Sequence, residues 1–161
     1  MPKILSFGYV DDVTIPHTED PHRYADHWEG AVIKMTDDRE LYVVIDNEQQ
    51  CCERSGVQLV QSDGYLDLPP DWPTFVGAEF LGTHVDSGWL GGADYGKKSM
   101  FVDIMTDMGT ATVHLYNSHN GYYGHACRVF LVYPELVTER RGMHTVVTKQ
   151  MKVTALHGAT L

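Results

Sequence analysis

The sequence predicts a single α+β domain built mostly from antiparallel β-sheet, with one or two short helices. Three observations predict this class. Short apolar runs are separated by turn-forming residues, no long apolar pattern repeats every 3.6 residues, and 161 residues with 43% hydrophobic content can bury a core. The chain divides into an irregular acidic arm, a first β unit, a connection rich in Pro and Gly, a second β unit and a C-terminal extension: residues 1–29, 30–61, 62–100, 101–133 and 134–161.

The first β unit follows a segment without a clear period. Residues 10–28 are rich in Asp, His and Pro and are predicted to be irregular. Residues 31–35 and 41–45 are apolar and flank the polar residues 36–40, which is the pattern of a β-hairpin.

A short helix is predicted after this hairpin. Asp46 or Asn47 can cap its start, because their side-chain oxygens accept hydrogen bonds from free N–H groups. Gly56 can end it. Residues 57–60 then predict a third strand.

The remaining strands are separated by two loops. Three prolines between residues 69 and 73 mark the first loop, and residues 87–96 form a second, glycine-rich loop that contains Trp89 and Tyr95. Strands are predicted at residues 76–85, 110–115, 129–133 and 145–153.

The two β units resemble each other at an offset of 70 residues. Val43 then falls on Val113, Asn47 on Asn117, and residues 57–60 on 127–130. The repeated order of strand, turn, strand, Asn-headed loop and strand indicates an internal duplication of a β-β-loop-β unit. The alternative is chance similarity between two hairpins. Duplication predicts that residues 32–59 and 102–129 are structurally equivalent.

The composition restricts the partners. A formal net charge of −10 repels phosphate backbones and anionic membranes, so we expect neither nucleic acid nor a membrane as partner. The longest apolar runs are far shorter than a membrane span, and the N-terminal residues lack the apolar stretch of a signal peptide. Three cysteines, two of them adjacent, do not suggest a secreted disulfide framework. We expect a cytoplasmic protein.

Residues 116–125 are the strongest candidate for a functional segment. They follow a predicted strand and combine two glycines with histidine, tyrosine and asparagine, a mixture suited to a binding loop on a β scaffold. Flat rings and amides suit a nucleotide-like small molecule or a protein partner. The alternative is that Asn117 and Asn120 only hold turns. The candidate ligand- or partner-binding residues are Asn117, His119, Asn120, Tyr122, Tyr123, His125, Glu48, Trp89 and Tyr95.

An enzyme is the second hypothesis. Cys51 or Cys52, with His119 or His125 and a carboxylate, could form a thiol site. Metal ligands could come from the same residues together with His114, Asp46 and Glu48, but no pair has a spacing typical of zinc. The Walker, dinucleotide-fold, HExxH and GxSxG motifs are absent. We therefore favour a protein that is not an enzyme and needs no cofactor or metal.

Two segments resemble the signature segments of a small bacteriophage and bacterial family classed as a domain of unknown function. They are D-N-E-x-x-C-C-E at residues 46–53 and Y-N-x-H-N-G-Y-Y-G-H at residues 116–125, and the likeness covers roughly residues 30–131. The resemblance implies a phage or prophage source and implies no activity. By analogy with phage biology, we expect an accessory protein that binds a host protein or sequesters a nucleotide-like small molecule in the host cytoplasm.

Overall fold

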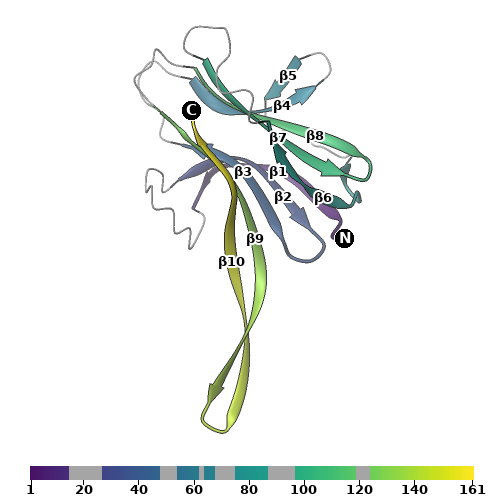
Figure 1. Cartoon of the computed structure of the whole chain (residues 1–161), viewed down its shortest axis with the longest axis vertical. Helices are drawn as coiled ribbons and strands as arrows, with labels where there is room; N and C mark the ends of the chain where they lie inside the picture. Colours follow the sequence, from purple (N-terminus) through teal and green to yellow (C-terminus); the bar gives the residue numbers. More distant parts are fainter. Residues whose placement is uncertain (15–26, 48–53, 62–63, 68–74, 87–96, 119–123) are drawn as a thin grey trace.

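The structure, a computed structural model, describes residues 1–14, 27–47, 54–61, 64–67, 75–86, 97–118 and 124–161. These residues form two five-stranded antiparallel sheets (Figure 1). The first sheet has the order β1 (Ile4–Val13), β2 (Trp28–Met35), β3 (Glu40–Asp46), β9 (Ala126–Arg141) and β10 (His144–Thr160). The second has the order β5 (Gly64–Asp67), β4 (Arg54–Gln61), β8 (Gly109–Ser118), β7 (Lys97–Thr106) and β6 (Phe80–Val85).

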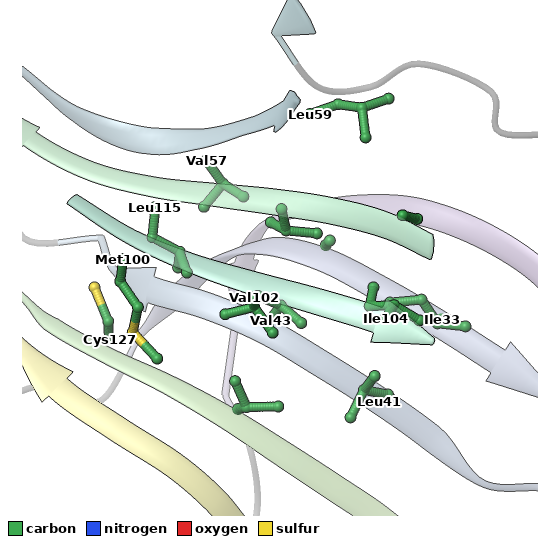
Figure 2. Close-up of a cluster of buried hydrophobic side chains, with 14 of the residues drawn as sticks. Ile33, Leu41, Val43, Val57, Leu59, Met100, Val102, Ile104, Leu115 and Cys127 are labelled. Atoms are coloured by element: carbon green, nitrogen blue, oxygen red, sulfur yellow. The ribbon is translucent and has the colours of Figure 1, made fainter. Parts of the chain in front are cut away.

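The two sheets pack face to face around one main core. Successive side chains of a strand point to opposite faces, so every second residue of the central strands faces the other sheet. Figure 2 shows this layer, in which Ile33, Leu41, Val43 and Cys127 of the first sheet meet Val57, Met100, Val102, Ile104 and Leu115 of the second. Each such apolar side chain stabilises the fold by roughly 1.5–3 kcal/mol on burial.

The last strand of each predicted β unit, β4 in the first and β9 in the second, pairs with a strand from the other half of the chain. In the first sheet Val43 pairs with Val129, and in the second sheet Val113 pairs with Leu59. The first half thus supplies β1, β2 and β3 to one sheet but β4 and β5 to the other, and the second half does the reverse. The predicted β-β-loop-β unit is therefore not one local sheet, because its third strand crosses over.

The strand pairings of the two halves correspond, with one shift. The offset of 70 residues relates β3 to β8 and β4 to β9. It fails for the first strand of each hairpin, because Ala31 pairs with Val43 whereas Val102 pairs with Val113, an offset of 71. The shift arises because the β7–β8 turn is one residue shorter than the β2–β3 turn. Met35 bonds Arg39 across the β2–β3 turn, whereas Thr106 pairs with Gly109 across the β7–β8 turn.

The predicted α+β class is wrong: the described residues contain no helix, only strands and turns. The helix expected after Asp46 cannot end at Gly56, because Gly56 lies inside β4, and residues 48–53 are outside the described part. Gly56 instead makes room for a cross-strand ring, since an added Cβ would lie 3.0 Å from the Tyr116 hydroxyl. A glycine inside a strand often marks such a close approach.

Three boundaries also need correction. The arm predicted to be irregular contains β1, whose residues are mostly exposed or half-buried and so lack a clear alternation. The strand expected at residues 76–85 begins only at Phe80. The C-terminal extension is the continuation of β9 and β10, which run past the sandwich as a long hairpin (Figure 1).

Candidate functional site

The two signature segments meet at one end of the sandwich. Asp46 is the last residue of β3 and His125 immediately precedes β9, and antiparallel pairing of these strands places the two residues side by side. Their side chains, only 5% and 2% exposed, form a hydrogen bond between Asp46 Oδ1 and His125 Nδ1. The other oxygen, Oδ2, accepts the Ala126 backbone N–H at 2.6 Å. An ionised carboxylate can only accept, so Nδ1 of His125 carries the proton.

Asn117 ties the second sheet to this pair. Its side chain is fully buried and donates a hydrogen bond to the Leu161 carbonyl at 3.1 Å. Leu161 in turn exchanges two backbone hydrogen bonds of 2.8 Å with His125. A continuous chain of hydrogen bonds thus runs from β3 through His125 and Leu161 to the end of β8.

A second acid faces the same end. Tyr9 on β1 donates a hydrogen bond of 2.8 Å to Glu29 on β2. Burial raises the pKa of Glu29, and this effect exceeds the lowering by the Tyr9 hydrogen bond and by the charge that His125 carries when it is protonated. Burial also raises the pKa of Tyr9, helped by the Glu29 carboxylate. The end of the sandwich therefore combines an imidazole, two acids and a phenol.

The structure anchors both signature segments at both ends. Segment 48–53 leaves β3 beside Asp46 and enters β4 at Arg54, whereas segment 119–123 leaves β8 at Ser118 and enters β9 beside His125. Asp46 is bonded to His125, and Arg54 is paired with Ser118. The four attachment points therefore form two adjacent pairs.

Of the predicted site residues, the structure describes Asn117 and His125, and it places both in this buried network. The others lie outside the described residues: Glu48, Trp89, Tyr95, His119, Asn120, Tyr122 and Tyr123. Sequence reasoning missed Tyr9 and Glu29 as members of the same end. The available signal was Glu29 beside the apolar residues of the predicted strand at residues 31–35.

Of the metal ligands considered from the sequence, the structure describes Asp46, His114 and His125, and it brings together only Asp46 and His125. His114 lies on the other face of β8 from Asn117, stacked on Phe101 with ring centroids 4.6 Å apart, and its Nε2 lies 2.7 Å from the Ser99 hydroxyl. No group of three His, Cys, Asp or Glu side chains able to hold a metal occurs among the described residues. Cys51 and Cys52 lie outside them.

Cys127 is a poor nucleophile. It is a free, fully buried thiol on the inner face of β9. Burial raises its pKa well above the ordinary value, and the Asp46 carboxylate adds to the shift, so the thiol stays protonated at neutral pH. What the described atoms offer chemically is an imidazole held in one tautomer by a carboxylate.

Comparison with known proteins places the chain without assigning an activity. In the described part, no helix has the length and apolar character needed to cross a membrane. No curated protein and no solved structure matches the chain. A family model described as Domain of unknown function (DUF7448) matches residues 10–129, which is most of the chain. By this match, the chain belongs to the DUF7448 family.

Proposed function

We propose that this protein is a non-enzymatic binding protein of phage or prophage origin that engages a host protein in the host cytoplasm through residues 48–53 and 119–123. The observation that carries the proposal is the double anchoring of these segments. Asp46 bonds His125 at one pair of attachment points, and Arg54 pairs with Ser118 at the other. Recognition residues are commonly carried on segments held by such a rigid base.

The network below the segments favours binding over a purely structural corner. Asp46, His125 and Asn117 already stabilise this end through buried hydrogen bonds. These bonds join the strand ends through residues other than those between the attachment points. The rings and amides of the residues between these points suit a protein contact or, as the second form of the same proposal, a nucleotide-like small molecule. The net charge of −10 favours a partner with a basic surface.

The test compares two double variants. His119→Ala with Tyr122→Ala removes two of the proposed contact groups, and His84→Ala with Tyr133→Ala removes the same residue types elsewhere on the surface. A host protein captured by the tagged wild-type chain should bind the purified chain stoichiometrically, and the first variant should lose that binding while the second keeps it. Thermal-shift measurements with nucleotides test the small-molecule form. The proposal fails if both variants bind every captured partner and every ligand like the wild type.

The enzyme hypothesis has one observation in its favour. A buried carboxylate that fixes the Nδ1 proton of a histidine is the arrangement that orients a general base. Against it, the His125 side chain is only 2% exposed. A thiol-reactive probe tests the thiol-enzyme form of this hypothesis. The probe should label Cys51 or Cys52 selectively at neutral pH, and this labelling should be lost in His125→Gln. Metal analysis of the purified chain tests the metal-dependent form.

A further inference from the structure

The hairpin formed by residues 133–152, here called the arm, pairs with no other strand in the described part of the chain. β9 pairs with β3 only from Cys127 to Val132, and among the described strands residues 133–141 pair with β10 alone. Nine residues at about 3.3 Å each make each strand of the arm roughly 30 Å long. Figure 1 shows the arm projecting beyond the sandwich. An isolated two-stranded hairpin is at best marginally stable in water, so a surface that covers the arm would stabilise it.

On one face of the arm, acidic and basic side chains form ion pairs with each other. Glu135 lies 2.5 Å from Lys152, and Glu139 lies 3.0 Å from Arg141. Both acids of the arm are used in these pairs. This face is suited to water.

The opposite face is apolar and cationic, and we call it the docking face. Leu136, Val147 and Met151 are 71%, 58% and 40% exposed. They alternate with Arg140 and with Lys149, which also reaches Asp38 at the base of the arm. The register places these residues on one side, because Leu136 pairs with Lys149 and Thr138 with Val147. No acid of the arm lies on the docking face.

Exposed apolar side chains also occur on the segments that adjoin the β7–β8 turn, and we call this set the Met108 patch. Its five members are Leu5, Val76, Leu81, Met105 and Met108. Backbone contacts join the segments that carry them, since Gly77 bonds Ile4 and Asp107 bonds Glu79. Gly82 pairs with Met105. The patch also carries the acids Glu79 and Asp107.

We propose that the docking face of the arm binds the Met108 patch of a second copy of this chain. Charge supports a second copy as the partner: the arm holds four Lys and Arg against two Glu, whereas the rest of the chain holds eight against twenty acids. Among the described residues, nearly all exposed large hydrophobic side chains fall in the arm or at the segments of this patch. Within one copy the arm projects away from the sandwich (Figure 1), and the large apolar side chains of the docking face and of the Met108 patch are exposed.

Self-association would go beyond the proposed function. The arm and the described ends of the signature segments lie on different parts of the molecule, so an oligomer would carry several candidate binding sites at once. Linked sites raise the apparent affinity for a multivalent partner without any new contact at each site. Loss of the oligomer would leave single-site binding intact, and loss of the site would leave the oligomer intact.

The first experiment is sedimentation velocity of the full chain over a range of concentrations. Leu136→Thr with Val147→Thr changes the docking face, and Val137→Thr with Val146→Thr is the matched change on the other face. The wild type should form a dimer or larger species, the first variant should dissociate at a concentration roughly tenfold higher or more, and the second should behave like the wild type. Circular dichroism checks that all three are folded.

The second experiment reverses the charges of Arg140 and Glu79 to test whether the docking face contacts the Met108 patch. Arg140→Glu and Glu79→Arg should each weaken self-association, and an equimolar mixture of the two variants should recover it. In the mixed dimer one contact keeps the wild-type charges and the other has both charges reversed, so both contacts join opposite charges. A wild type that is monomeric at every concentration overturns the proposal, as does equal weakening by the two threonine variants. Binding of a monomeric wild type to anionic phospholipid vesicles, lost in Arg140→Glu, would assign the arm to a lipid surface and would likewise overturn it.

Discussion

Both halves of β9 pair with β10, but only the first half also pairs with a strand on its other side. From Ala126 to Val132 the strand lies between β3 and β10, and most of its side chains are buried. From Tyr133 to Arg141 it pairs only with β10 among the described strands, and every side chain is at least partly exposed. Because the backbone pairing with β10 continues along the whole of β9, the two halves differ chiefly in how deeply their side chains are buried. Hydrogen bonds align the strands, and apolar burial supplies most of the net stability.

The largest expected effect comes from removing the carboxylate that anchors the start of β9. Asp46→Ala leaves the buried His125 ring and the Ala126 N–H without their acceptor. We expect the free energy of unfolding to fall by about 3–5 kcal/mol, measured by urea denaturation.

The matched control is an exposed pair of the same chemistry. Asp12 and His27 are 2.7 Å apart with side chains 63% and 56% exposed, and Asp12→Ala should cost less than about 1 kcal/mol. Equal losses for the two variants would contradict the assignment of Asp46 as the anchor.

The second prediction compares two valines on the same strand. Val129 is fully buried in the first half of β9, and Val137 is half-buried in the arm. Val129→Ala should cost about 2–3 kcal/mol because it leaves a cavity, whereas Val137→Ala should cost under about 1 kcal/mol. Denaturation midpoints of the two variants, measured together, test this. A larger loss for Val137 would mean that the arm is part of the cooperative core.

These contrasts also show what the sequence could predict of the fold. The β2–β3 hairpin and strands β4 and β8 were predicted correctly because compact apolar runs flanked by turn residues indicate strands. The crossover of β4 and β9 was not predicted, because the choice of partner strand depends on contacts far apart in sequence. The predicted helix end at Gly56 was wrong because this glycine resembles a helix C-cap, whereas it lies in β4 and makes room for Tyr116.

The candidate site was predictable only in part. The polar residues at the ends of two predicted strands pointed to both signature segments, and Asp46 and His125, which lie 79 residues apart, do meet. Their burial was not foreseen, because composition alone does not separate a binding histidine from one that holds strands together. Tyr9 was missed together with β1, since an edge strand with many exposed residues lacks the alternation that identifies strands.

The third prediction uses pH to test the environment of Glu29. Its pKa in the folded state lies above the ordinary value of 4.5, chiefly because of burial. The folded state therefore binds this proton more tightly, so the contribution to stability is full below about pH 4.5 and is lost as the pH rises through the folded-state pKa. Glu29→Gln removes this titration. The stability of the variant relative to wild type should thus increase from pH 4 to pH 8, measured by urea denaturation, and a relative decrease over this range would contradict the raised pKa.

The smallest expected effect lies in the arm. Lys152 and Glu135 form an exposed ion pair at 2.5 Å, and the Glu135 carboxylate raises the pKa of Lys152. Exposed pairs are screened by water and salt, so Glu135→Gln should leave the denaturation midpoint of the protein unchanged within error. The same variant should lower the pKa of Lys152 toward its ordinary value, which NMR titration of the side chain can measure. Detecting the pKa change without a change in stability would show that an interaction in the arm is real yet contributes little to the fold. A clear loss of stability would instead mean that this part of the arm is buried in solution, as it would be if the contact between copies covered this face as well.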